Sequence, residues 1–209
     1  IAVECREFGT IDFVGESVVR VRGLPHVRTM EVVRLPESRY GMAFNLEADA
    51  ASVVMLDPVA GIEAGDEVQR TGRVLDVPVG DALLGRTVDP LGRPLDSRGA
   101  VAVSERRTIE RRAPEIMDRA PVTEPLQTGL QVVDALIPVG RGQRELIVGD
   151  RKTGKTAIAV DAMINQRDKN VICIYCAIGQ RSAAVAQVVS DLQEHGALDH
   201  CIIVVATGE

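Results

Sequence analysis

The chain has 209 residues, of which 45% are apolar, so it is long enough for two domains and can bury a core without disulfides or metals. Its formal net charge of −6, with no long basic run, argues against duplex DNA or a polybasic membrane surface as a partner. Tryptophan is absent and aromatic residues make up only 2%, which disfavours single-stranded nucleic acid, and no apolar run reaches the length of a membrane span.

The first third of the chain has the pattern of an all-β domain. Short apolar runs recur about every ten residues, and Gly-, Pro- and Asp-containing turns separate most of them. The runs cover residues 9–14, 17–22, 30–35, 41–46, 52–56 and 67–71. Val19 and Val21 alternate with Arg20 and Arg22, as in a half-buried strand. We therefore predict a small closed β-barrel over residues 1–72, because closure leaves no sheet edge exposed.

Residues 73–125 are predicted to form a connecting region packed on the domain that follows, because they hold six of the ten prolines. Residues 89–92, Asp-Pro-Leu-Gly, are typical of a β-turn with Pro at its second position. Asp81 is a candidate N-cap for one helical turn. The arginine pairs at 106–107 and 111–112 are interleaved with acids, so we interpret them as a solvated surface.

From residue 126 the pattern changes to α/β, and residues 149–156 have the phosphate-binding pattern G-x-x-x-x-G-K-[ST], so we predict that 126–209 are the N-terminal part of a P-loop nucleotide-binding domain. Thr128 is a candidate cap for a helix through 132–136 that Pro138 ends. The predicted strands cover 145–148, 171–176 and 201–206, and the predicted helices cover 157–166 and 181–194, the second ending near Gly196. Fully apolar strands separated by helices indicate a parallel sheet covered on both faces.

Between the first of these strands and its helix lies a complete phosphate-binding pattern, G-x-x-x-x-G-K-[ST]. Its residues are Gly149, Asp150, Arg151, Lys152, Thr153, Gly154, Lys155 and Thr156. A loop in this place directs backbone N–H groups and a helix N-terminus at one anion. Lys155 is predicted to reach the β and γ phosphates of a nucleotide, and the Thr156 hydroxyl to bind Mg²⁺.

Two of the four cysteines, Cys173 and Cys176, form a C-x-x-C within a predicted strand. Residues three apart on a strand face opposite sides, so the two thiols are not expected to bind one ion together. With no second C-x-x-C and no histidine close to this pair in the sequence, we interpret the cysteines, Cys5 and Cys201 included, as buried reduced thiols.

An Asp at the end of a strand, which P-loop proteins use for Mg²⁺, is not found in the sequence. The Asp residues after the loop fall in predicted helices or turns: Asp161, Asp168, Asp191 and Asp199. Three strands also do not complete a sheet of this type, so we expect the chain to be a fragment of a longer protein.

At this point the motifs identify a family. The segment 140–156, which contains the phosphate loop with its Asp150-Arg151 pair, closely resembles the α subunits of F-type ATP synthases. Further segments resemble the same family along essentially the whole chain: 41–47, 70–73, 77–80, 84–89, 125–130 and 175–180. Catalytic β subunits of this family instead have a phosphate loop rich in Gly and Val, without the Asp-Arg pair.

The resemblance implies a β-barrel crown, a RecA-like nucleotide domain and a C-terminal helical domain that is absent from this sequence. It also implies membership of the F1 sector, in a ring of three α and three β subunits with central and peripheral stalks. The α sites hold Mg-ATP or ADP without turnover, in an enzyme that couples ATP synthesis to proton (or sodium) transport. Such a subunit is peripheral on the cytoplasmic or equivalent face of an energy-transducing membrane.

Two residues bear on turnover within this resemblance. Gln180 occupies the position of the catalytic Glu of β-type subunits, and a carboxamide cannot usefully accept the proton of an attacking water. Lys152 stands where the family usually has Gln, and it adds a positive charge beside the nucleotide, which could strengthen phosphate binding or change the contacts on the base side. No catalytic residue is therefore predicted in this chain.

Two alternatives to a synthase α subunit stay open. One is a self-sufficient RecA-like ATPase motor of the flagellar-export or termination-factor type, which predicts Glu at position 180 and, for termination factors, an aromatic and basic RNA surface. The other is an isolated module in which nucleotide is purely structural. Turnover distinguishes the motor from the rest, and co-purification with a β subunit separates the remaining two.

Overall fold

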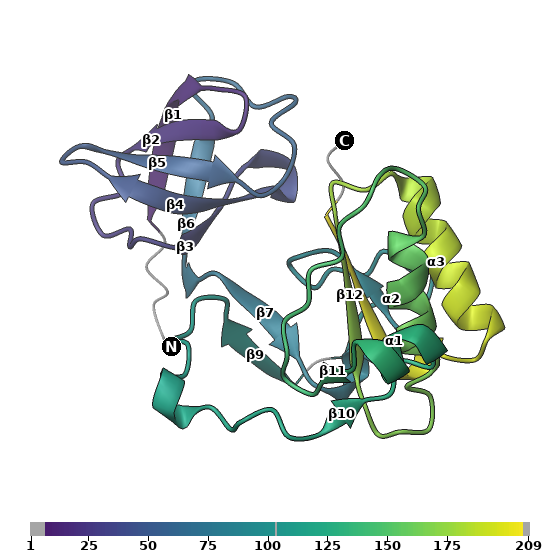
Figure 1. Cartoon of the computed structure of the whole chain (residues 1–209). Coiled ribbons are helices and arrows are strands. Elements are labelled where there is room, and N and C mark those ends of the chain that lie inside the picture. Colours follow the sequence, from purple (N-terminus) through teal and green to yellow (C-terminus); the bar gives the residue numbers. More distant parts are fainter. Residues whose placement is uncertain (1–6, 103, 207–209) are drawn as a thin grey trace. The chain divides into compact units, whose positions relative to one another are not determined.

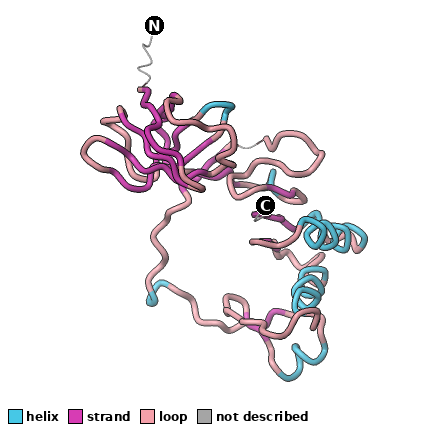
Figure 2. The backbone as a smooth tube through the Cα atoms, turned by 90° about the horizontal axis from the view of Figure 1, so that it is seen from above, coloured by secondary structure: helices cyan, strands magenta, loops and turns pink. Residues whose placement is uncertain are grey.

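The computed structural model describes residues 7–102 and 104–206, which form two compact units. Unit 1 holds the described residues up to Asp76 together with Thr108–Glu110. Unit 2 holds those of Val77–Arg107 and from Arg111 onward. Figure 1 shows the elements of both units along the chain, and Figure 2 shows that strands dominate unit 1 whereas the long helices belong to unit 2.

Unit 1 is a closed six-stranded β-barrel, which confirms the predicted fold of this part. Its strands are β1 (Phe8–Val14), β2 (Val18–Arg22), β3 (Glu31–Arg34), β4 (Tyr40–Leu46), β5 (Ala50–Met55) and β6 (Glu67–Val74), with one 3-10 turn, η1 (Pro36–Ser38). They close in the order β1-β2-β5-β4-β3-β6, and every neighbouring pair is antiparallel. The barrel interior takes alternate residues of each strand, so Val19 and Val21 are fully buried while Arg22 is exposed.

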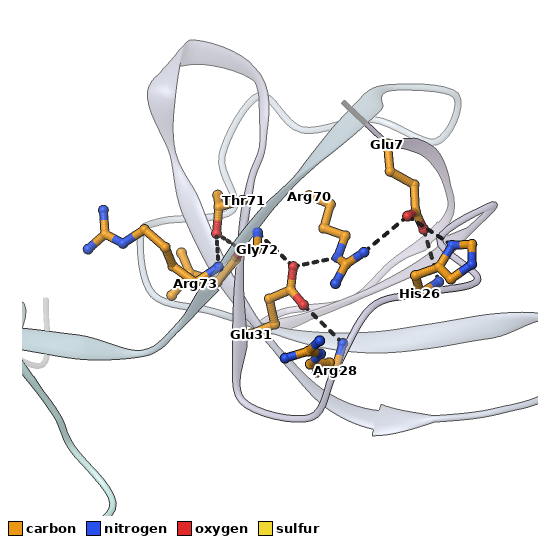
Figure 3. A network of polar contacts seen from close by, with 9 residues as sticks. Glu7, His26, Arg28, Glu31, Arg70, Thr71, Gly72 and Arg73 are labelled. Atoms are coloured by element: carbon orange, nitrogen blue, oxygen red, sulfur yellow. Dashed lines mark hydrogen bonds and ion pairs between the residues drawn. The ribbon is translucent and has the colours of Figure 1, made fainter. Parts of the chain in front are cut away.

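One charged side chain is also buried in unit 1. Glu31 is only 1% exposed, and its carboxylate accepts hydrogen bonds from Arg70 Nε at 2.7 Å, the Gly72 N–H at 2.8 Å and the Arg28 N–H at 3.1 Å. Figure 3 shows this network, which Arg70 extends to Glu7. Because three donors satisfy the carboxylate, the buried charge stabilises the contact between β3 and β6 and does not destabilise the barrel.

Unit 2 is built from short strands and three α-helices. The strands are β7 (Asp76–Val79), β8 (Thr87–Val88), β9 (Glu105–Thr108), β10 (Pro125–Leu126), β11 (Val139–Gly140), β12 (Cys173–Ile178) and β13 (Cys201–Ala206). The α-helices are α1 (Gln131–Leu136), α2 (Lys155–Ile164) and α3 (Ser182–Glu194), and the 3-10 turns are η2 (Asp81–Leu83), η3 (Ile116–Asp118) and η4 (Leu198–His200). The main sheet runs β12-β13-β8 with parallel pairing, while β7 pairs with β9 and β10 with β11.

The helices α2 and α3 pack on one face of this sheet (Figure 1). Their apolar residues meet alternate residues of β12 and β13 in one buried cluster that includes Val160, Leu192, Ala177 and Ile203. The other face of β12 is open, since Ile178 is 78% exposed. The expectation of a sheet covered on both faces is therefore wrong for the described residues, because both helices that flank β12 pack on the same side.

The predicted strand at 145–148 is not formed. This segment has no regular structure, and Leu146 and Val148 are 84% and 79% exposed. Within the described ranges it pairs with no other strand, and an apolar strand without a hydrogen-bonded neighbour and a covering layer has nothing to hold it extended. The helix and strand predictions that follow it are confirmed as α2, β12, α3 and β13, with β12 beginning two residues later than expected.

The two predicted side-chain caps are wrong. Gly80, not Asp81, precedes η2, and Leu130 precedes α1, with no capping side chain at either place. Thr128 instead donates its N–H and its hydroxyl to Asp134 at 2.9 and 2.7 Å. These two hydrogen bonds lower the pKa of Asp134, so Thr128 fixes the loop onto α1 from outside the helix.

Two turns form where the sequence predicts them. The Gly92 N–H donates to the Asp89 carbonyl at 2.9 Å, which closes the expected β-turn. At the end of α3, Gly196 adopts a φ of 64° and its N–H donates to Gln193, while the Ala197 N–H donates to Leu192. This is a Schellman motif with glycine at the predicted position, where a left-handed backbone favours a residue without Cβ.

Candidate functional site

The phosphate-loop residues form a turn that leads directly into helix α2. Gly154 immediately precedes α2 and has φ 89° and ψ 10°, a left-handed conformation that glycine adopts without steric cost. Lys152, also in this turn, has φ 63°, and the Thr153 hydroxyl donates to the Asp150 carbonyl at 2.8 Å. No side chain caps α2, so its first N–H groups point out of the helix toward the loop.

Lys155 folds back over this loop. Its ammonium donates to the Gly149 carbonyl at 2.6 Å and also to the Asp150 carbonyl. A lysine held by two loop carbonyls keeps its charge in front of the helix N-terminus, where an incoming phosphate can take over these hydrogen bonds.

A cavity of about 370 Å³ lies beside the loop. It is lined by Lys152, Thr153, Gly154, Lys155, Thr156 and Ala157. All of these except Ala157 are predicted site residues. Gly149 and Asp150 do not line the cavity but supply the carbonyls that accept from Lys155. Arg151 neither lines the cavity nor holds Lys155. The lining combines two lysines with two threonine hydroxyls and a helix N-terminus, so the arrangement suits an anion bearing a divalent cation.

Gln180 follows β12 and precedes α3, after Gly179 with its φ of 64°. The Tyr175 hydroxyl donates to Gln180 Oε1 at 3.0 Å, so this side chain is held by the strand that leads to it. The carboxyl ends of β12 and β13 and the amino end of α2 lie at the same side of unit 2 (Figure 1). In open parallel α/β sheets ligands bind at this side, and Gln180 and the phosphate loop both lie there.

The aspartates after the loop lie where the sequence predicts. Asp161 is in α2, Asp191 in α3, Asp199 in η4, and Asp168 in a turn with φ 66°. None of these four ends a strand, so none of them is a strand-end carboxylate for Mg²⁺, whereas Thr156 offers its hydroxyl at the start of α2.

The cysteines differ in part from the prediction. Cys173 and Cys176 do face opposite sides of β12, as expected, but only Cys173 is buried whereas Cys176 is exposed. Cys5 lies outside the described residues. No histidine is close to Cys173 and Cys176 in the sequence, but His200 lies beside Cys173 and Cys201 in space. The parallel register that pairs Cys173 with Cys201 brings them together, and only the adjacency of His200 to Cys201 signals this cluster in the sequence.

Comparison with known proteins matches both parts of the chain to one family. The model of the ATP synthase alpha/beta family beta-barrel domain matches residues 5–72, and that of the family's nucleotide-binding domain matches residues 129–209. Among the described residues, no helix has both the length and the apolar character needed to cross a membrane.

Curated relatives point the same way. ATP synthase subunit alpha 2 of Syntrophus aciditrophicus is 60% identical over 98% of this chain, and its namesake from Albidiferax ferrireducens is 60% identical over 97%. ATP synthase subunit alpha 1 of Psychromonas ingrahamii is 55% identical over 99% of this chain. The chain spans only 39%, 38% and 40% of these three relatives, respectively.

Proposed function

We propose that this chain, which belongs to the ATP synthase alpha/beta family, is the nucleotide-binding part of a non-catalytic α subunit in the F1 sector of an ATP synthase. The observation that carries the proposal is the phosphate loop in front of α2, with Gly154 left-handed and the Lys155 ammonium held over the loop carbonyls. This arrangement binds phosphate groups by backbone N–H donors, a helix dipole and one lysine ammonium.

In this proposal the ligand is Mg-ATP or Mg-ADP. Lys155 leaves the Gly149 carbonyl for the β and γ phosphates, and the Thr156 hydroxyl at the start of α2 holds Mg²⁺. When bound, the metal neutralises phosphate charge; the chain's own residues supply binding and orientation. The resemblance of the Asp150-Arg151 pair to α-type loops supports this assignment over a β-type catalytic site.

The bound nucleotide is held rather than hydrolysed. Hydrolysis needs a group that takes a proton from the attacking water, and Gln180 presents a carboxamide whose oxygen already accepts the Tyr175 hydroxyl. Loss of a general base typically costs ~10²–10⁴ in rate. The chemistry of synthesis is then carried by partner β subunits in an α3β3 ring around a central stalk, braced by a peripheral stalk.

This subunit contributes to ATP synthesis coupled to proton (or sodium) transport, on the cytoplasmic or equivalent face of an energy-transducing membrane. Co-expression with the cognate β subunit tests the assembly directly. Recovery of a complex of alternating α and β subunits is expected, and failure of the intact subunit to associate would favour an isolated nucleotide-binding module.

A nucleotide titration tests the site. The wild-type chain should bind Mg-ATP, and Lys155→Ala should weaken binding at least tenfold, since a charge-assisted hydrogen bond contributes about 1.5–3 kcal/mol. The matched control is Lys169→Ala, which removes the one lysine outside the loop and should leave affinity unchanged. Equal affinity of wild type and Lys155→Ala would refute the assignment of the loop.

Turnover separates this proposal from a self-sufficient motor. Wild type should bind Mg-ATP without measurable hydrolysis, and Gln180→Glu alone should not create a fast ATPase, because the Asp150-Arg151 pair of the loop also differs from catalytic subunits. Rapid hydrolysis by the chain in the absence of β subunits would instead identify a RecA-like motor.

A further inference from the structure

A second cluster of ligand-type side chains lies away from the phosphate loop. Cys173 is the first residue of β12, Cys201 is the first residue of β13, and the two are directly opposite in the parallel register. His200, the last residue of η4, precedes Cys201. One ligand atom from each of the three side chains lies within 4.8 Å of the other two. This cluster stands at the amino ends of the strands, whereas the nucleotide site stands at their carboxyl ends.

The surroundings of the cluster suit a metal more than a plain apolar core. Cys201 is 0% and Cys173 9% exposed, so both sulfur atoms are shielded, while His200 is half-buried and leaves a route from solvent. His200 Nε2 lies 3.1 Å from the Met163 carbonyl, which can only accept, so Nε2 is the donor there and a neutral imidazole has Nδ1 available as a metal ligand. Histidines that bind metals commonly donate their second ring N–H to a backbone carbonyl in this way.

We propose that Cys173, His200 and Cys201 bind one thiophilic divalent cation of the Zn²⁺ class through two thiolates and one imidazole. Zinc bonds of about 2.3 Å to sulfur and about 2.0–2.1 Å to nitrogen set tetrahedral ligand atoms roughly 3.5–3.8 Å apart. The ligand atoms therefore need to approach one another by about 1.3 Å at most. The fourth position is left for water, as in other sites with three protein ligands.

Metal binding releases the protons of the two cysteine thiols. Each thiol loses its proton to solvent as its sulfur bonds the metal, and the Cys201 S–H, which otherwise donates to the Ala197 carbonyl at 3.0 Å, gives up that hydrogen bond. The neutral imidazole binds through its free lone pair and releases no proton. The bound ion then joins β12 to β13 and, through the His200 bond to Met163, to α2, so its expected effect is structural.

Cobalt titration of the reduced, chelator-treated full chain tests the site, because Co²⁺ bound by thiolates gives charge-transfer and tetrahedral d–d bands. We expect saturation at one equivalent and displacement of Co²⁺ by Zn²⁺. The matched control is Cys176→Ser, which removes the exposed thiol on the opposite face of the same strand and should bind like wild type.

Variants of the three ligands should weaken binding by about a hundredfold or more. Cys173→Ser should also lose the charge-transfer intensity of one thiolate, and His200→Gln, at a half-buried position, keeps the test valid if a buried cysteine variant fails to fold. Circular dichroism establishes folding before each titration. Absence of thiolate bands in the folded wild type, or equal binding by Cys173→Ser and Cys176→Ser, would overturn the proposal.

Discussion

Replacing the buried Glu31 by glutamine should strongly destabilise the barrel, although the two side chains have nearly the same shape. Both carboxylate oxygens face N–H donors: Arg70 and the Gly72 N–H on Oε1, and the Arg28 N–H on Oε2. A carboxamide has one NH₂ group, so in either orientation of the substituted side chain that group faces a donor. At least one hydrogen bond is lost, and the guanidinium of Arg70 loses its buried counter-charge.

The size of this destabilisation follows from the burial of Glu31 and Arg70. Glu31 is 1% and the Arg70 side chain 19% exposed, so solvent cannot replace the lost partner. Breaking a buried ion pair by removing one partner costs about 3–5 kcal/mol, and because glutamine retains some acceptor capacity we expect about 3 kcal/mol. The hydrogen bond from Arg70 to the Glu31 carboxylate also raises the pKa of Arg70, because the carboxylate favours the charged guanidinium.

The assay is chemical denaturation followed by circular dichroism, in which the midpoint should fall while the slope m stays unchanged. The matched control is Glu37→Gln, since Glu37 pairs with Arg39 but is 69% exposed, and an exposed pair contributes about 0–1 kcal/mol. The reasoning is refuted if the free energy of unfolding of Glu31→Gln lies within about 0.5 kcal/mol of the wild-type value, or if its denaturation midpoint is no lower than that of Glu37→Gln.

Three other substitutions test an ion pair, the phosphate loop and a tight backbone contact. Asp96 pairs with Arg86 at 2.7 Å, and the hydrogen bond holds the pKa of Asp96 at about 2, below its ordinary 3.8. The resulting stability of about 2 kcal/mol is present above pH ~4 and is lost as pH falls through 2, so Asp96→Asn should unfold more easily than wild type at pH 6 and nearly equally at pH 2. Lys152→Gln should weaken Mg-ATP binding several-fold in calorimetry, and more so at low salt, because the Lys152 charge lines the cavity at the loop. An unchanged affinity would show that Lys152 does not contribute to phosphate binding and would limit its role to contacts with the nucleotide base. Gly9→Ala should lower the free energy of unfolding by about 1–3 kcal/mol in thermal unfolding, since the new Cβ would clash with the Arg22 carbonyl oxygen; a variant as stable as wild type would show that this backbone shifts easily.

The barrel could be predicted because its information is local. Alternation in Val18–Arg22, apolar runs of strand length and tight turns between them each act over a few residues, and all six strands formed. The pairing order β1-β2-β5-β4-β3-β6 was not predictable in the same way, because it depends on contacts between strands far apart in the chain. The finer division into a barrel of residues 1–72, a connecting region and a nucleotide domain from 126 stays a prediction.

The failures share a physical cause. Residues 145–148 have the composition of a buried strand, but a strand is stabilised by neighbours, and no described segment pairs with them. Thr128 has the residue type of an N-cap, yet its hydroxyl donates to Asp134, which the fold places within 2.7 Å. In both places the available hydrogen-bonding partners, and not residue type alone, decided the structure: no strand pairs with 145–148, and Asp134 lies six residues from Thr128.

By itself the sequence determined the barrel, the order of the helices and strands that follow the phosphate loop, the glycine that ends α3, and a carboxamide at position 180. These depend on residue type and spacing within a few turns of chain. Only the tertiary structure decided that Glu31 is buried among three donors, that Lys155 rests on its own loop carbonyls, and that Cys173, His200 and Cys201 meet. The reason is that strand register and the packing of distant segments set these distances, and no single stretch of sequence encodes them.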